Sequence, residues 1–161
     1  MNAIAILCLL AVAADYDSLI TDLAGDASQA SAAYQELKNA GTDAFPALAR
    51  RMNDQTIANN IFQGASVGIG PHIGQVALDL VRLQVEGNWG KSVRDYSALS
   101  KENASTWIVA HAGQSVRAMR VHALTESLNS VSRDISKDGC SQHEADALKF
   151  LVERLKTTLA E

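Results

Sequence analysis

Helical periodicity is the feature that most constrains how this chain can fold. From residue 15 onward, apolar residues recur three and four positions apart in nearly every segment, and glycine or a capping side chain stands at most segment ends. This spacing puts the apolar side chains on one face of an α-helix, whereas a half-buried strand needs strict alternation. Aromatic residues make up only 5% of the 161 residues, and only two are proline. We therefore expect one all-α domain over residues 15–161, a bundle of about six or seven helices.

Capping residues place the ends of several predicted helices. Asp26 can cap a helix that ends at Gly41, and Pro46 suits the first turn of the next helix. Ser141 followed by Glu144 is a capping box, which predicts a last helix from there to the end of the sequence. We expect a largely buried helix that starts at residue 71 or 72 and ends at residue 87. Residues 88–99 and 132–139 are predicted to be loops.

Residues 22–52, with the sequence DLAGDASQASAAYQELKNAGTDAFPALARRM, resemble a HEAT-like helical repeat. The likeness lies in an alanine- and leucine-rich helix with Ala33 and Leu37, a turn at Gly41, and a second helix around Pro46 and Leu48. It covers about one unit, and no second copy follows at a period typical of repeat proteins. The resemblance implies a fold built partly of HEAT-like hairpins. Residues 81–108 are also similar to small secreted bacterial proteins, a likeness that implies no activity.

The first fourteen residues favour export. An apolar run over residues 3–14 stops at Asp15, and it is shorter than the roughly 20 residues that a membrane-spanning helix needs. Ala11-Val12-Ala13 has the small-x-small pattern of a cleavage site. We expect a signal peptide over residues 1–14, a secreted or periplasmic protein, and no stable membrane insertion after cleavage. The alternative is an N-terminal helix buried in the fold.

Charge and cysteine content exclude some classes of partner and site. The formal net charge is −4 and the Lys and Arg residues are not clustered, so we expect no nucleic-acid partner. Removal of the signal peptide would remove Cys8 and leave Cys140 alone, without an internal disulfide. Cys140 and His143 have metal-ligand spacing, but they supply only half of a zinc site. His111 and His122 could lie on neighbouring helices, but only half of a site is local in the sequence, and we expect no metal and no cofactor.

The glycine-rich segment of residues 64–74 contains Gly64-Ala65-Ser66-Val67-Gly68, which matches the G-x-S-x-G pattern of serine hydrolases. That motif needs a buried strand before the serine, and no segment here predicts a parallel sheet. A phosphate-binding loop would need a lysine where Pro71 and His72 stand. We therefore expect a bend or a hinge, with Gly74 allowing close helix packing. An unrecognised hydrolase using Ser66, His72 and Asp79 remains the less favoured hypothesis, and we expect no catalytic residues.

One short segment has the composition of a contact surface. Residues 88–96, NWGKSVRDY, contain Trp89, Lys91, Arg94 and Tyr96, and aromatic residues with arginine are typical of interface hot spots. Alternatively, the two rings fold back and cover helix ends. The sequence predicts a non-catalytic protein-binding or scaffolding module with another protein as its partner. The alternative is an envelope inhibitor or immunity-type protein that blocks an enzyme with this loop.

Overall fold

The computed structural model describes residues 15–59 and 70–161, and in them the chain is all-α without a β-strand. This confirms the predicted all-α, multi-helix domain. The elements are α1 (Tyr16–Asp22), α2 (Ala27–Ala40), the 3-10 helix η1 (Gly41–Ala44), α3 (Phe45–Arg50), α4 (Ile73–Val85), α5 (Lys91–Arg94), α6 (Ala104–Ala110), α7 (Val116–Asp138) and α8 (Gln142–Ala160). None of the helices in the described part of the chain combines the length and the hydropathy that crossing a membrane requires.

The predicted caps of α2 and α8 are present. The Asp26 carboxylate accepts hydrogen bonds from the backbone N–H groups of Ser28 and Gln29, and the Gln29 side chain accepts one from the backbone N–H of Asp26. Gly41 follows α2 with a φ of 60°, a conformation that favours glycine. Ser141 and Glu144 form the predicted capping box of α8. Local sequence chemistry therefore sets these helix ends.

Two of the predicted loops are partly helical. Residues 91–94 form the short helix α5, and α7 continues to residue 138 instead of ending before residue 132. The reason is that Val131 is buried and Ile135 packs against the same cluster, so the apolar face of α7 extends through the polar stretch.

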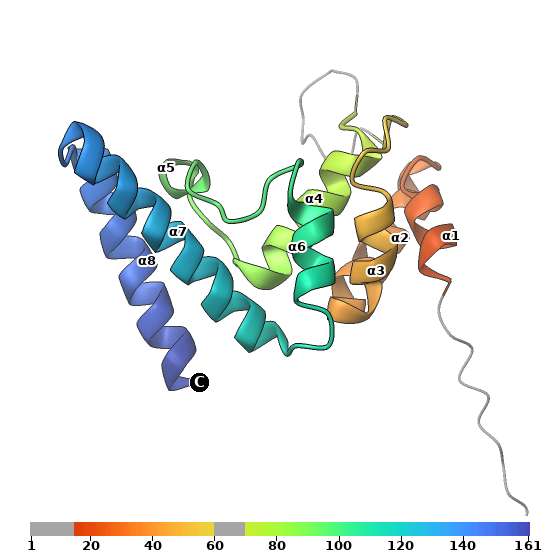
Figure 1. Cartoon of the computed structure of the whole chain (residues 1–161). Coiled ribbons are helices and arrows are strands. Elements are labelled where there is room, and N and C mark those ends of the chain that lie inside the picture. Colours follow the sequence, from red (N-terminus) through yellow and green to blue (C-terminus); the bar gives the residue numbers. More distant parts are fainter. Residues whose placement is uncertain (1–14, 60–69) are drawn as a thin grey trace, which may run out of the picture.

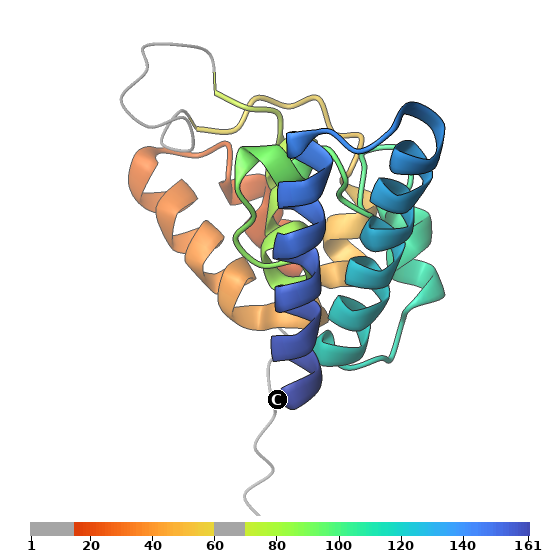
Figure 2. The same ribbon diagram turned by 90° about the vertical axis from the view of Figure 1, so that its left-hand side faces the viewer.

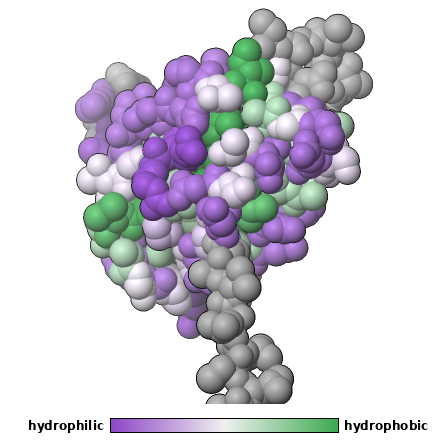
Figure 3. All heavy atoms as spheres, turned by 90° about the vertical axis from the view of Figure 1, so that its right-hand side faces the viewer, coloured by the Kyte–Doolittle hydropathy of each residue, from purple (hydrophilic) through white to green (hydrophobic). Residues whose placement is uncertain are grey.

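The larger hydrophobic core lies among the helices from α1 to α4, α6 and the first turns of α7. As predicted, α4 is central: its buried residues are Ile73, Gly74, Val76, Ala77, Leu78, Leu80, Val81 and Val85. Figure 1 shows α4 between the N-terminal helices and the pair α7 and α8. In Figure 3, which views the molecule from the side of α1, the surface is mainly hydrophilic and its apolar side chains form separate spots. The N-terminal helices thus direct much of their apolar surface inward.

A second hydrophobic cluster joins α5 to α7 and α8. It contains Trp89, Val93, Tyr96, Leu124, Val131, Ala147 and Leu151. α7 and α8 lie side by side along one side of the molecule (Figure 2), and the segment around α5 packs against them. This packing fixes the chain between α4 and α6 next to α7, where the candidate site lies.

Candidate binding groove

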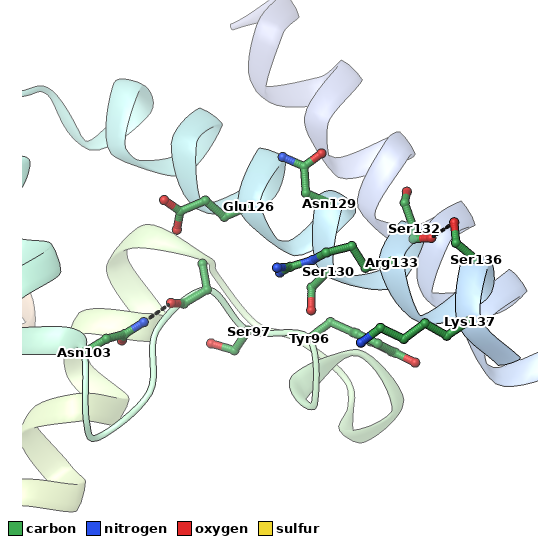
Figure 4. Close-up of a pocket in the computed structure, with 11 residues that line it drawn as sticks. Tyr96, Ser97, Asn103, Glu126, Asn129, Ser130, Ser132, Arg133, Ser136 and Lys137 are labelled. Atoms are coloured by element: carbon green, nitrogen blue, oxygen red, sulfur yellow. Dashed lines mark hydrogen bonds between the residues drawn. The ribbon is translucent and has the colours of Figure 1, made fainter.

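An open groove of about 930 Å³ lies between α7 and residues 96–103, the segment that precedes α6 (Figure 4). α7 contributes Glu126, Asn129, Ser130, Arg133 and Lys137 to its lining, and the facing segment contributes Tyr96, Ser97 and Asn103. Most of these side chains are polar. The groove therefore offers hydrogen-bonding groups and charges to an occupant more than apolar surface.

Hydrogen bonds hold the wall formed by residues 96–103. The Asn103 side chain accepts a hydrogen bond from the Ser100 backbone N–H at 2.7 Å and donates one to the Ala98 carbonyl at 2.8 Å. The Ser97 hydroxyl lies 2.8 Å from the Leu99 carbonyl oxygen and 2.6 Å from a carboxylate oxygen of Glu86. Because these side chains bond within the protein, the wall is organised before any occupant binds.

Glu86 connects this wall to the central helix. Glu86 directly follows the last residue of α4, and the residue is only 3% exposed. Burial raises the pKa of Glu86 above the ordinary value, while the hydrogen bond from Ser97 and the positive charge of Arg82 act in the opposite direction. Arg82 in turn donates to the Leu99 carbonyl at 2.9 Å. The groove wall is thus attached to α4 at two points.

Among the described residues, the α7 side of the groove has one carboxylate that is hydrogen-bonded within the protein and two cations without a partner. Glu126 accepts a 3.0 Å hydrogen bond from the indole N–H of Trp107 in α6. Arg133 and Lys137 are exposed, and neither forms a hydrogen bond or an ion pair with any residue that the structure describes. Their donors remain available to an occupant, whereas Glu126 is already used within the protein.

The structure buries the two aromatic residues that the sequence suggested for a contact surface. Trp89 is 6% exposed, its indole N–H donates to the Glu86 carbonyl at 2.6 Å, and its ring meets Phe150 edge-on at 6.2 Å. Tyr96 is 7% exposed, and its hydroxyl lies 3.4 Å from Glu144. Both rings therefore fold back against helices, which was the alternative interpretation, and they do not form an exposed contact surface.

Three of the four predicted contact residues, namely Trp89, Arg94 and Tyr96, are divided between two hollows. Arg94 is exposed and lines a smaller pocket of about 190 Å³ that also includes Asp79, Glu86 and Trp89, whereas Tyr96 lines the groove. Lys91 is the first residue of α5. The segment of residues 88–97 thus contributes side chains to two separate hollows.

The residues considered for catalysis are in part outside the described structure. Ser66 and the rest of the Gly64–Gly68 motif lie outside the described residues. His72 precedes α4, and its Nδ1 atom lies 2.8 Å from the Gln55 carbonyl oxygen. Asp79 accepts a hydrogen bond from Gln75 at 3.1 Å. His72 therefore pairs with a backbone carbonyl, and Asp79 pairs with a side-chain amide.

The residues considered for metal binding lie apart in two small clusters. His111 stacks on Trp107 at 3.9 Å, and the His122 ring lies 5.0 Å from His111. Cys140 is exposed and forms no disulfide, and His143 packs against Tyr96. Within residues 15–59 and 70–161, no three His, Cys, Asp or Glu side chains are arranged to hold a metal ion.

The groove residues of α7 were not predicted from the sequence. Glu126, Ser130, Arg133 and Lys137 follow one another at three- and four-residue spacing, which places them on one helix face. That spacing is readable in the sequence once residues 132–138 are recognised as part of the helix. The facing wall carries no comparable signal, because its position depends on contacts with α4.

Comparisons of the chain with protein-family models, with curated proteins and with solved structures find no match.

Proposed function

We propose that this chain is a non-catalytic helical module that binds another protein, and that the partner docks in the groove between α7 and residues 96–103. The observation that supports this most directly is the pairing of a hydrogen-bonded wall with free polar side chains on one long helix. Binding surfaces of this kind lose little entropy on association, because one side is already ordered.

The composition of the groove favours a polypeptide over an apolar small molecule. Pockets for small ligands are enclosed and mainly apolar, whereas this groove is open and has serine, asparagine, arginine and lysine side chains along α7. A polypeptide segment brings backbone N–H and C=O groups that need partners. Ser130 and Asn129 can supply hydrogen bonds to such groups. The groove thus suits a segment of a partner protein that lies along α7.

The inhibitor alternative fits the structure less well. An inhibitory loop at residues 88–96 would present Trp89 and Tyr96 to the enzyme that it blocks. Both rings are buried, and Trp89 packs against Phe150 of α8. Exposing them would open the second hydrophobic cluster, so we propose docking in the groove instead.

Export belongs to the same proposal and rests on residues 1–14. We propose that these residues are a signal peptide and that the module works in the periplasm or outside the cell, with partly HEAT-like hairpins among its N-terminal helices. The intact mass of the protein purified from its own host tests this. A mass that has lost the first 13 or 14 residues supports export, and the full-length mass contradicts it.

Site-specific photo-crosslinking in the native host tests the docking surface. A benzophenone amino acid replaces Ser130 in the groove, and a matched control places it at Gln35, an exposed residue of α2 on the other side of α4 (Figure 1). We expect one discrete protein adduct from Ser130 and none from Gln35. Equal labelling from both positions, or none from Ser130 in a protein whose circular dichroism is native, would contradict the proposal.

A further inference from the structure

We infer that the groove binds an extended acidic segment, in which two carboxylates two residues apart pair with Arg133 and Lys137. This inference rests on the proposed function, since the acidic segment would belong to the partner protein. It is carried by the position, exposure and lack of partners of the two cations.

The two cations lie on the same face of α7. They are four residues apart, which corresponds to a rise of about 6 Å along a helix. Figure 4 shows both side chains directed from α7 toward the space in front of Tyr96 and Ser97. They therefore present two positive charges, side by side, to anything that lies in the groove.

Three arginines of α4 and α7 have structural partners. Arg82 donates to the Leu99 carbonyl, Arg117 to the Thr158 carbonyl at 2.9 Å, and Arg120 to the Val85 carbonyl at 3.0 Å. Each of these bonds ties two elements together. Arg133 and Lys137 have no such bond to a described residue, so the packing of the described helices does not require their charges.

The neighbouring carboxylates limit what can bind. Glu126 lies seven residues before Arg133, about 10 Å along α7. Burial raises the pKa of Tyr96, and the negative charges of Glu144, of Asp134 on α7 itself and of Asp95 raise it further. A long acidic run would meet these negative groups as well as the two cations. A short segment with two carboxylates gains both ion pairs and avoids this repulsion.

The spacing of the cations fits an extended occupant. In a β-like strand, residues i and i+2 point to the same side and lie about 6.6 Å apart, close to the rise between the two cations. An extended backbone also leaves N–H and C=O groups unpaired, which Asn129 and Ser130 can bond. A helical occupant has already satisfied those groups internally, so it would leave the polar lining of the groove unused.

An NMR titration of the isotope-labelled protein tests the inference. The probe is a synthetic peptide with the sequence Gly-Ser-Asp-Thr-Asp-Ser-Gly, compared with the same peptide carrying Asn at both Asp positions. We expect the acidic peptide to shift backbone amide signals of residues 129–137, and the Asn peptide to bind at least about tenfold more weakly.

Charge-removing variants locate the binding. Arg133→Gln and Lys137→Gln should each weaken acidic-peptide binding about threefold to fivefold, as expected for exposed ion pairs. Lys149→Gln removes the same charge from an exposed residue of α8 outside the groove lining, and it should leave binding unchanged. Equal binding of both peptides, no shifts with either, or an equal effect of Lys149→Gln would overturn the inference.

The two proposals fail in different ways. If Ser130 captures a protein partner but the acidic peptide does not bind, the groove is a docking site for another kind of segment and only this inference falls. If the acidic peptide binds in the groove but Ser130 captures no protein in the host, the charge recognition stands and the proposed function falls.

Discussion

The hydroxyl of Ser97 donates a 2.6 Å hydrogen bond to the buried carboxylate of Glu86. Glu86 follows the central helix α4, and Ser97 belongs to the wall of the groove. This contact therefore joins the hydrophobic core of the domain to its candidate binding surface. A carboxylate so deeply buried is costly unless it is hydrogen-bonded, so the bond stabilises both the helix end and the wall.

We expect Ser97→Ala to destabilise the fold by about 1–3 kcal/mol, the usual cost of leaving a buried polar group without its partner. The variant removes the hydroxyl that donates to Glu86 and that also accepts a hydrogen bond from the Leu99 backbone N–H. Urea unfolding measures the change. Ser132→Ala is the matched control, because this serine is exposed on α7, and its effect should stay within about 0.5 kcal/mol. Equal effects of the two variants would refute the structural role of Ser97.

The raised pKa of Glu86 predicts a specific pH dependence of stability. Because the folded protein binds this proton more tightly than the unfolded chain does, the contribution of Glu86 is full below the ordinary glutamate pKa. It is then lost as the pH rises through the raised pKa. Glu86→Gln removes the titrating group and keeps an oxygen that can accept from Ser97.

The measurement is the free energy of unfolding of both proteins at several pH values. Relative to Glu86→Gln, the natural protein should lose stability as the pH increases from below the ordinary glutamate pKa toward neutrality. Parallel curves for the two proteins would show that the Glu86 pKa is not raised by folding.

Trp89 and Arg94 separate the structural interpretation of residues 88–96 from the contact-surface interpretation. We expect Trp89→Ala to cost about 3–5 kcal/mol of stability, since it leaves a cavity in the second hydrophobic cluster. Arg94→Ala changes an exposed side chain and should cost at most about 0.5 kcal/mol. Thermal unfolding of the two variants checks this. A native-like melting temperature for Trp89→Ala would mean that the ring is not part of the core.

The sequence predicted what depends on local chemistry. The caps at Asp26 and Ser141, the turn at Gly41 and the buried character of α4 are each set by residues within one or two helical turns. The extension of α7 beyond Val131 was not predicted, because most residues after Val131 are polar. Ile135 alone continues the apolar face there.

The groove was missed for a different physical reason. Its geometry is set by contacts between different elements: Ser97 bonds to Glu86 at the end of α4, and Trp107 of α6 bonds to Glu126 of α7. Such contacts leave no periodic trace in the sequence. For the same reason, the composition of residues 88–96 suggested an exposed surface. In the structure, Trp89 packs against Phe150 of α8 and the Tyr96 hydroxyl lies next to Glu144 of α8, so both rings are buried.

Gly74 offers a last test, of how tightly α4 is held against the N-terminal helices. A Cβ atom built at this position would lie 2.3 Å from the carbonyl oxygen of Met52, a contact that the backbone must move to relieve. This agrees with the expectation that Gly74 serves close packing. Although alanine favours helix formation by about 1 kcal/mol, we expect Gly74→Ala to destabilise the protein by about 1–3 kcal/mol, because overpacking outweighs that gain.

The control for Gly74→Ala is Gly90→Ala. A Cβ atom at Gly90 would meet nothing within 4 Å, and its φ of −66° suits any residue. Urea unfolding should therefore show a change of at most about 0.5 kcal/mol for Gly90→Ala. If Gly74→Ala proves as stable as the natural protein, the Met52 carbonyl can move away at little cost. The start of α4 would then be held mainly by its hydrophobic side chains, such as Ile73 and Val76, and not by close backbone packing.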